Sequence, residues 1–413
     1  MLPIDFPQSV EVYFVACHPN ATSHFKDFTE TLKNRGIGCR IIKPEDVAEG
    51  RKIHELPEEE FSVLAQRIAK ECQPATCVIT DVGHSFLVQV QQALKDEYPN
   101  ITRIAYYDNP EPFVPVYSET AARVMAVANA ILFANNRLVD KGIMGTEGKT
   151  QIGLGYYPMA DVDEIRTLRT SDVRQQKRQE FLAKAGVDDH GQPIMVYFGG
   201  ANDVYYREAF PHFLKTLELA AEQQDLSTLT IVVQQHPRAR TEGNIDGSLV
   251  EEWKKSAKKN FPQITLSQGS FSEALIVADS AAYYQTSAAP KFLMMGIPTM
   301  QIGHEPYDDV LTRYQLIPSA TEAKSFLIGL HSLREPNAEC IERVYDQLGI
   351  NKEWPDVFTQ FVQHLPDAKI DQHHRNIIAT LIEISVGHQS LCRRLYRMIL
   401  NKFSSLTASC HIP

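Results

Sequence analysis

Two hydroxyl residues in the second half of the chain stand where an anion could be held. Thr286 and Ser287 end a short apolar run, a pattern with helical spacing follows, and Gly296-Ile297-Pro298 then opens another apolar run. The order is strand, helix, turn, strand. Hydroxyls at the start of a helix lie beside unpaired backbone N–H groups and the positive end of the helix dipole. The segment predicts a phosphate-binding turn, although the same hydroxyls could simply cap the helix. Lys291, one turn later, could reach the anion or remain solvated.

A histidine and an arginine follow a β-branched run about fifty residues earlier. Leu229 to Gln234 predicts a buried strand, and His236, Pro237 and Arg238 come directly after it. Ligands of open α/β sheets bind at the carboxyl ends of strands. We therefore expect His236 to donate to a phosphate or ribose and Arg238 to add charge. The alternative is a strand-end histidine that bonds a loop carbonyl.

A double glycine follows the strand at 194–198. Gly199 and Gly200, with Asn202 two residues on, lack the side chains that keep a ligand from the backbone, as phosphate-binding loops require. A tight turn would use the same residues. Read with the two segments above, this turn predicts a site for a nucleotide mono- or diphosphate sugar.

The first half offers candidates for a general base. Asp81 and His84 end a buried strand and start a helix, so we expect Asp81 to act as base with His84 as its partner. Either residue could instead belong to an ordinary helix start. Asp108 and Glu111 lie on a proline-stiffened loop suited to an acceptor rim. His18 follows the first strand on the same side, and His18 or His24 could replace Asp81 as the base.

Composition excludes several classes of protein. The 413 residues are 43% hydrophobic and 22% charged, which is typical of globular domains and long enough for two of them. The net charge of -10 argues against a nucleic-acid binder. Seven irregularly spaced cysteines fit free thiols in a reducing compartment, and we expect neither a disulfide framework nor a zinc site. No secretory signal or membrane-length apolar run is evident, so we expect a cytoplasmic protein.

Strands alternate with helices twice along the chain, which predicts two doubly wound α/β domains. Residues 1–158 form the first Rossmann-like domain in this interpretation and 193–320 the second. Residues 159–192 connect them through one long, arginine-rich helix from Asp161 to Ala185, and 321–413 are mainly helical. Within that last segment, 390–403 place apolar residues on one face and basic residues nearby. This could be a membrane-surface helix, but a helix packed on the body is the simpler interpretation.

The glycine turn, the His-Pro pair and the hydroxyl pair stand in the order found in GT-B glycosyltransferases, which the second half of the chain, roughly 193–305, resembles. The combination is most similar to sialyl-, polysialyl- and Kdo-transferases that use CMP-sugars. The resemblance implies two Rossmann-like domains facing a cleft, with a nucleotide-sugar donor on the second domain and the acceptor on the first. Non-hydrolysing sugar-nucleotide epimerases share this architecture.

On the interpretation that the chain lacks an Asp-x-Asp metal-binding sequence, we expect a metal-independent glycosyltransferase of the GT-B type with no cofactor other than its nucleotide-sugar co-substrate. Its acceptor could be a glycan, a lipid or a protein. Charge on the departing phosphate would be met by His236, Arg238 and the helix start. An epimerase or sugar-nucleotide hydrolase on the same scaffold, and a non-catalytic nucleotide-sugar-binding protein, are the alternatives.

Overall fold

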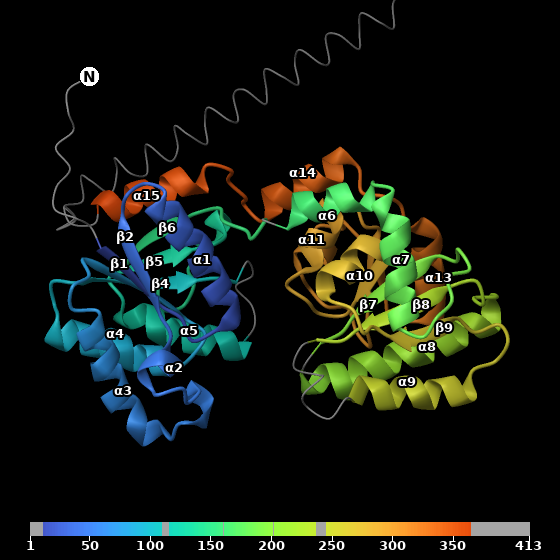
Figure 1. The fold of residues 1–413 in the computed structure, drawn as a ribbon, viewed down its shortest axis with the longest axis horizontal. Helices are drawn as coiled ribbons and strands as arrows, with labels where there is room; N and C mark the ends of the chain where they lie inside the picture. Colours follow the sequence, from blue (N-terminus) through green and yellow to red (C-terminus); the bar gives the residue numbers. More distant parts are fainter. Residues whose placement is uncertain (1–10, 110–114, 160, 201, 237–244, 365–413) are drawn as a thin grey trace, which may run out of the picture.

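The computed structural model describes residues 11–109, 115–159, 161–200, 202–236 and 245–364. It consists of two α/β lobes, each built on a six-stranded sheet in which every strand pair is parallel (Figure 1). The predicted arrangement of two doubly wound domains is confirmed. Arg238, Glu111 and the segment 390–403, for which roles are predicted above, lie outside the described residues.

The first sheet has the strand order β2-β1-β3-β4-β5-β6. Its strands are β1 (Glu11–Val15), β2 (Gly38–Ile42), β3 (Cys77–Asp81), β4 (Thr102–Tyr107), β5 (Ala130–Phe133) and β6 (Thr150–Gly153). The helices between them are α1 (Pro19–Lys33), α2 (Pro44–Val47), α3 (Glu58–Glu71), α4 (Phe86–Glu97) and α5 (Pro115–Val127). The inner strands β3, β4 and β5 are almost wholly buried because helices cover both faces of a parallel sheet, whereas the edge strands β2 and β6 keep exposed or half-buried positions.

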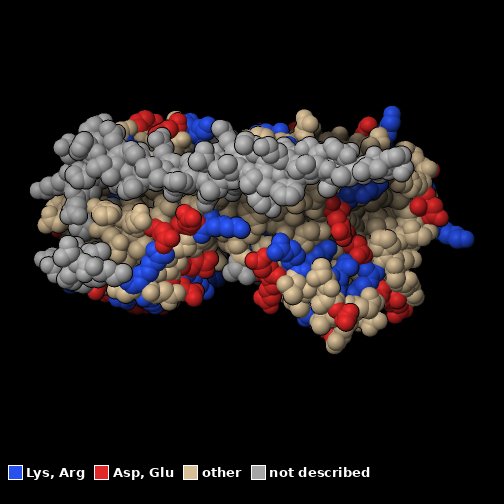
Figure 2. All heavy atoms as spheres, turned by 90° about the horizontal axis from the view of Figure 1, so that it is seen from above, with Lys and Arg blue, Asp and Glu red and all other residues tan. Residues whose placement is uncertain are grey.

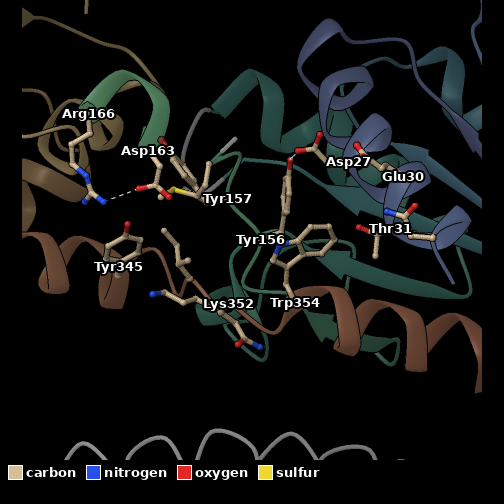
Figure 3. A pocket seen from close by; sticks show the side chains of 14 residues that line it. Asp27, Glu30, Thr31, Tyr156, Tyr157, Asp163, Arg166, Tyr345, Lys352 and Trp354 are labelled. Atoms are coloured by element: carbon tan, nitrogen blue, oxygen red, sulfur yellow. Dashed lines mark hydrogen bonds and ion pairs between the residues drawn. The ribbon is translucent and has the colours of Figure 1, made fainter. Parts of the chain in front are cut away.

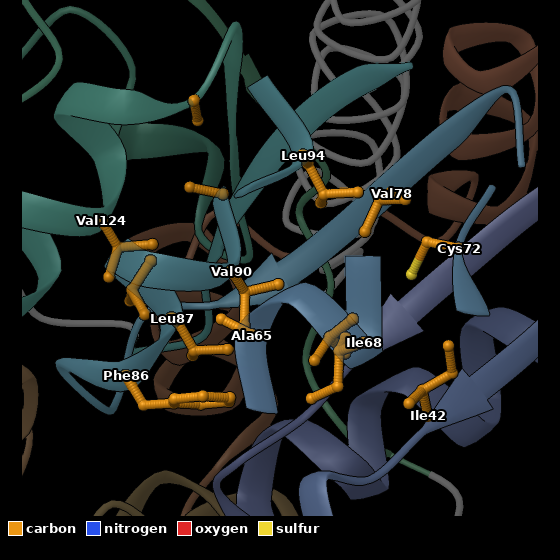
Figure 4. Packing of buried hydrophobic residues seen from close by; sticks show 14 of the residues in the cluster. Ile42, Ala65, Ile68, Cys72, Val78, Phe86, Leu87, Val90, Leu94 and Val124 are labelled. Atoms are coloured by element: carbon orange, nitrogen blue, oxygen red, sulfur yellow. The ribbon is translucent and has the colours of Figure 1, made fainter. Parts of the chain in front are cut away.

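One face of this sheet is covered by α3, α4 and α5. Figure 4 shows Ile68 of α3 and Val90 of α4 packed towards Val78 of β3, all fully buried. These side chains recur at helical spacing along α3 and α4 because only one stripe of each helix faces the sheet. The register pairs Val15 of β1 with Thr80 of β3, so the turn after β1 lies beside the end of β3.

The second sheet has the order β12-β11-β10-β7-β8-β9. Its strands are β7 (Ile194–Phe198), β8 (Thr230–Gln234), β9 (Gln263–Leu266), β10 (Ser280–Tyr283), β11 (Thr299–Ile302) and β12 (Ser319–Ala320). Its helices are α8 (Phe210–Gln223), α9 (Ile245–Ser256), α10 (Phe271–Val277), α11 (Ala289–Met294), α12 (Val310–Arg313), α13 (Ala323–Ser332) and α14 (Ala338–Gln347). A π-helical turn, Tyr205–Ala209, precedes α8.

The prediction of one long helix from Asp161 to Ala185 is wrong. The segment forms two helices, α6 (Val162–Arg169) and α7 (Val173–Lys184). Between them the hydroxyl of Thr170 donates to the carbonyl of Thr167, and that of Ser171 donates to the carbonyl of Leu168. Such hydroxyls compete with the backbone for helix hydrogen bonds, and the first helix ends there.

The arginines of α6 and α7 hold the end of α10. Arg169 donates to the carbonyls of Leu275 and Ala278, and Arg174 reaches Ile276 and Val277. Side chains of this kind satisfy carbonyls that a helix C-terminus leaves unpaired. Both helices also bury apolar residues in the second domain's core. This segment therefore belongs structurally to the second domain.

The chain returns to the first domain in its last described helix, α15 (Trp354–His364), which lies over the left lobe in Figure 1. Phe358 of α15 is fully buried against Phe14 and Phe28, with ring centroids 6.5 and 4.8 Å away. The chain crosses between the domains twice, first near Gly155 and then near Asn351, and we call these two segments the interdomain passages. They contact each other, because the N–H of Asn351 donates to the carbonyl of Gly155 at 2.7 Å.

Glycine is required on both passages. Gly155 and Gly349 have φ of +65° and +60°, which side chains rarely adopt. A Cβ on Gly155 would lie 2.5 Å from the carbonyl oxygen of Gly349, and one on Gly349 would overlap Asn136 Oδ1. The two passages thus form one close-packed crossing.

Seen from above, the described surface carries Lys and Arg interspersed with Asp and Glu on both lobes (Figure 2). On that face the visible described atoms form no continuous basic stripe. Among the helices of the described ranges, none combines the length and apolar character needed to cross a bilayer.

Candidate functional site

A cavity of about 140 Å³ lies between the two domains. Its first-domain wall includes His24 of α1 and Asp108 after β4, and its second-domain wall includes Ser287 and Lys291. The sheets explain this meeting. In each sheet the order in which successive strands are added reverses beside the first strand, at β1/β3 and at β7/β10. Ligands of such sheets bind outside the carboxyl ends of the strands at this switch point.

His24 is the titratable group most enclosed by this cavity. Its side chain is 3% exposed, and Nδ1 lies 2.9 Å from the hydroxyl of Tyr106. Its ring meets the ring of Tyr156 edge-on at 5.0 Å. Burial lowers the pKa of His24, and the nearby carboxylates of Asp108 and Asp27 oppose that shift. A histidine with a lowered pKa is neutral at pH 7 and can accept a proton.

Asp108 lines the same cavity and is 6% exposed. The structure therefore places this predicted acceptor-side residue on the cavity wall, and its role towards an acceptor stays a prediction. Its negative charge also raises the pKa of Asp81 and of His24. The cavity wall thus holds a carboxylate and an imidazole, and the charge of the carboxylate opposes the lowering of the imidazole pKa.

Asp81, predicted as the base, is fully buried and does not line the cavity. Oδ2 accepts from the N–H groups of Cys17 and His18 at 2.6 and 3.2 Å, and Oδ1 accepts from Gly83 at 2.7 Å. Burial raises the pKa of Asp81 to about 7, and these donors act in the opposite direction. Geometrically, the carboxylate joins the turn after β1 to the turn after β3.

The structure does not bring His84 and Asp81 together as a hydrogen-bonded pair. His84 Nδ1 accepts from the N–H of Phe86 at 3.1 Å, and its ring meets that of Phe61 edge-on. Burial lowers the pKa of His84, with a smaller effect from His54. His84 therefore faces α3, and its predicted partnership with Asp81 lacks a contact.

His18 also has a local role. It is the N-cap of α1, and its Nδ1 accepts from the N–H of Asn20 at 3.4 Å. Asn20, rather than His18, lines the cavity. His18 is near the predicted acceptor side, but its ring is turned to the helix start.

The hydroxyl pair stands two residues before its helix. α11 begins at Ala289 with Ala288 as its N-cap, so the alternative in which Thr286 or Ser287 simply caps the helix is wrong, and phosphate binding by this turn stays a prediction. Thr286 Oγ1 accepts instead from the N–H of Ala288 at 3.3 Å, and the carbonyl of Ser287 accepts from the hydroxyl of Tyr157 at 3.1 Å. With six residues, α11 offers a weaker dipole than a long helix would.

Lys291 is 15% exposed, and its Nζ lies 2.7 Å from Asp161 Oδ1. It therefore lines the cavity as a member of an ion pair rather than as a solvated lysine. An anion entering the cavity would meet this ammonium group at the wall. The prediction that Lys291 binds the donor remains open, with a competing carboxylate now identified.

Phe271 provides an exposed aromatic face in the cavity. It is 37% exposed and packs on Phe198 and Phe292, with ring centroids 5.3 and 6.4 Å away. A planar apolar surface held by two other rings suits a flat or apolar part of a ligand.

Gly199 and Gly200 make room for protein atoms. A Cβ at either position would lie less than 3.0 Å from Tyr205, whose ring fills this side of the turn. Asn202 accepts from the N–H of Tyr205 at 2.8 Å and donates to Gln285 Oε1 at 3.1 Å. These residues organise the edge of the second sheet, and any contact with a donor stays a prediction.

His236 is exposed two residues past β8 and is not part of the cavity wall. Its predicted role in donor binding is not resolved by the cavity geometry.

One Asp-x-Asp sequence, Asp161-Val162-Asp163, was overlooked in the expectation of a metal-free site. Its carboxylates pair with different cations, Asp161 with Lys291 and Asp163 with Arg166 at 2.8 Å. Within the part of the chain that the structure describes, no three His, Cys, Asp or Glu side chains gather in an arrangement suited to a metal ion.

Several cavity residues were missed from the sequence. Asn135 follows β5 as Asp108 follows β4, and Tyr156 and Tyr157 follow β6. A search of the first four residues after every predicted strand would have included all three, because Asn135 lies two residues past β5 and Tyr156 and Tyr157 lie three and four past β6. Phe271 gave no such signal, because it stands at the start of a helix.

No protein-family model matches the chain, and a search of curated proteins gives no match. Solved structures do share its fold. The α,α-trehalose 6-phosphate synthase of Burkholderia multivorans superposes with a TM-score of 0.58 at 9% identity, covering 88% of this chain and 98% of that one. S. aureus MnaA with UDP gives 0.55 at 7% identity, covering 86% and 96%.

A third similar structure is the UDP-GlcNAc 2-epimerase of Neisseria meningitidis bound to UDP-GlcNAc. Its TM-score is 0.53 at 9% identity, with 85% of this chain and 99% of that chain covered. Identities this low establish architecture alone. Together with the two six-stranded parallel sheets, they identify the chain as a two-domain α/β protein of GT-B-like fold.

Proposed function

We propose that the chain is a GT-B-type glycosyltransferase that moves a sugar from a nucleotide-sugar donor to an acceptor without a bound metal ion. The observation that carries the proposal is the cavity between the domains. It combines His24 and Asp108 from one domain with Ser287 and Lys291 from the other. A transfer reaction needs two substrates oriented against each other and a base beside the acceptor hydroxyl.

We assign the base to His24 rather than to Asp81. The neutral imidazole lines the cavity, and Asp108 nearby stabilises its protonated form, as the raising effect on its pKa indicates. Asp81 has both oxygens engaged by backbone N–H groups. In this assignment Asp81 is a positioning residue.

The transfer step then balances as follows. The acceptor hydroxyl gives its proton to His24, and its oxygen bonds to the anomeric carbon of the sugar. The bond from that carbon to the phosphate oxygen breaks, and the nucleotide leaves with the electron pair. Lys291 and Ser287 face the developing charge on the phosphate.

The donor we propose is a nucleoside diphosphate sugar, and the first nucleotide to test is uridine diphosphate. Two of the similar structures hold UDP or UDP-GlcNAc. CMP-sugars, which the motif order favours, are the second choice. Phe271 is suited to pack against the base or the sugar.

The second candidate function is epimerisation or hydrolysis of the sugar nucleotide. It is favoured by the likeness to UDP-GlcNAc 2-epimerase. A non-catalytic sugar-nucleotide-binding protein is the third candidate.

One experiment separates the three candidates. The full chain is incubated with UDP-GlcNAc, UDP-glucose or CMP-sialic acid, with and without a mixture of glycan acceptors, and products are followed by NMR. Nucleotide release that requires an acceptor supports transfer. Release or isomerisation of donor alone supports the second candidate, and calorimetric binding without any turnover supports the third.

A further inference from the structure

A second and larger cavity, about 800 Å³, adjoins the crossing of the two interdomain passages. We call it the rear cavity and define it by Asp27, Glu30, Tyr156, Tyr345, Lys352 and Trp354. Figure 3 shows α1 on one side of it, α6 on the other, and the passage into α15 between them. Its size is in the range of pockets that hold small molecules, which often lie at domain interfaces.

Aromatic rings form much of its wall. Trp354 and Tyr345 come from the α14–α15 region, and Tyr156 and Tyr157 come from the first passage (Figure 3). Trp354 is held by ring contacts with Tyr156 at 4.8 Å and Phe28 at 5.4 Å. Rings fixed in this way lose little entropy when a ligand packs on them.

Polar groups of α1 line the cavity beside these rings. Asp27 Oδ2 accepts from the hydroxyl of Tyr156 at 2.5 Å, and Glu30, Thr31 and Asn34 lie along the same helix. Carboxylates, a hydroxyl and an amide provide many acceptors and some donors for a ligand rich in hydroxyl groups.

The charges on the wall disfavour a polyanion. Arg166 is paired with Asp163 at 2.8 Å, as the dashed line in Figure 3 marks. Lys352 lines the same cavity as two carboxylates of α1, Asp27 and Glu30. With Asp163 the lining holds three carboxylates and two cationic side chains, so a nucleotide or polyphosphate would meet more negative than positive groups.

We propose that the rear cavity binds an uncharged oligosaccharide of two or three sugar units. Sugar rings present C–H faces that pack on aromatic rings and hydroxyls that donate to carboxylates. The cavity lining supplies both kinds of partner. This saccharide site is a different cavity from the proposed donor site, although the two share lining residues, and saccharide binding there needs no nucleotide.

The rear cavity is coupled to the cavity between the domains by shared walls. Tyr156 and Tyr157 line both. Tyr156 bonds Asp27 on one side and touches the ring of His24 on the other. A saccharide that displaces the Tyr156 hydroxyl from Asp27 would alter the packing of His24, so binding at the two sites should be linked in both directions.

The test uses tryptophan fluorescence of the full chain. The protein has two tryptophans, and Trp253→Phe leaves Trp354 as the sole reporter. This variant is titrated with maltotriose, cellotriose and triacetylchitotriose, without nucleotide. We expect a saturable change in emission with at least one trisaccharide. We expect Asp27→Asn with Glu30→Gln to weaken that affinity at least about tenfold, as loss of charged hydrogen-bond acceptors does.

The control is Glu71→Gln, an exposed carboxylate at the end of α3, which should leave the affinity unchanged. Melting curves verify folding. If Asp27→Asn unfolds the protein, the double variant Glu30→Ala with Asn34→Ala is used instead. It removes exposed groups from the same helix face of the cavity.

The proposal is overturned if no trisaccharide gives a saturable change. It is also overturned if the affinity survives both wall variants, or if tripolyphosphate binds there more tightly than any saccharide. These outcomes are independent of the proposed function, because saccharide binding is measured with the cleft empty of nucleotide. Saccharide binding without any UDP binding would reject the proposed donor and keep this site.

Discussion

The two sheets have related topologies but their carboxyl edges differ in chemistry. The first edge carries titratable groups in buried positions: Asp81, Asp108 and, beside them on α1, His24. The second edge is built mainly from glycines, amides and tyrosine rings, with Asn202 bonded to Gln285 and Gln285 bonded to the hydroxyl of Tyr307 at 2.7 Å. Under the proposed function, the first domain would supply proton transfer and the second domain a largely uncharged surface for the donor.

Compensating hydrogen bonds explain how a buried carboxylate is accommodated at the first edge. A buried carboxylate is tolerated where backbone donors compensate for lost water, as three N–H groups do for Asp81. The second edge has a comparable buried carboxylate, Asp246, whose pKa is raised by burial. It lies on α9, beside Gln235, rather than at a strand end.

The largest effect that would sharpen this comparison is expected at His24. His24→Asn places an amide near the position of Nδ1, so it can keep the bond to Tyr106 while removing the base. We expect turnover to fall about a hundredfold or more, with UDP affinity nearly unchanged. Steady-state kinetics and calorimetry measure the two quantities. The matched control is His212→Asn on α8, which does not line the cavity and should keep the wild-type rate.

Equal loss of turnover in both histidine variants, or a wild-type rate in His24→Asn, would break the assignment. In that case Asp81→Asn and Asp108→Asn decide between the remaining bases. A large loss only in Asp81→Asn would return the role to the residue first predicted.

The next effect concerns stability at the first edge. The pKa of Asp81 is about 7 in the folded chain and about 3.9 in an unfolded one. The folded chain therefore binds this proton more tightly, and the resulting stabilisation is full below pH 4 and lost as pH rises through 7. Asp81→Asn lacks this dependence. From pH 5 to pH 8 we expect wild type to lose about 2 kcal/mol or more relative to the variant.

Urea unfolding at the two pH values measures this difference. Asp356→Asn, an exposed carboxylate on α15, serves as the control and should follow wild type. A difference between wild type and Asp81→Asn that stays constant with pH would mean that Asp81 is ionised throughout.

A smaller effect is expected at the second edge. Thr286→Ala with Ser287→Ala removes two hydroxyls next to the cavity and leaves the backbone N–H groups in place. We expect UDP affinity to fall about tenfold, a loss of about 1.4 kcal/mol, with the melting temperature little changed. His236→Ala tests the other predicted donor contact in the same assay. Calorimetry showing unchanged affinity in both variants would remove these residues from the donor site.

Removal of metal ions is expected to leave turnover unchanged, which is the smallest of the effects. Activity should survive EDTA, because Lys291 and Ser287 are proposed to face the departing phosphate and the two carboxylates of Asp161-Val162-Asp163 are engaged elsewhere. Turnover is compared before and after chelation. Loss of activity that magnesium or manganese restores would show that the second edge is not neutral in the working enzyme.

The sheets could be predicted from sequence more accurately than the site. Strand β7 has the predicted ends and β8 begins one residue after the predicted start, because buried parallel strands appear as apolar runs between polar turns. Helix ends were less accurate, as in the segment 161–185 and at α11, because helix ends depend on local hydrogen bonds that composition does not reveal.

The site was only partly predictable for a physical reason. Asp108, Ser287 and Lys291 were found because residues after parallel strands, and at the helices that follow, gather at one edge. The packing role of the glycines at 199–200 could not be predicted, because Tyr205, which lies several residues later, occupies the space that their missing side chains leave. The contact of His24 with Tyr156, 132 positions later in the numbering, depends on tertiary packing that no local pattern encodes.

The return of α15 to the first domain has a consequence for synthesis. Phe14 and Phe358 share one core but are separated by the whole second domain. At about 5–20 residues per second, a ribosome would make the second residue roughly 20 to 70 seconds after the first. During that interval the nascent first domain displays the apolar groove that Phe358 later fills. We therefore expect chaperones to bind stalled chains that end before Trp354, and to release those that include α15 and have left the ribosome.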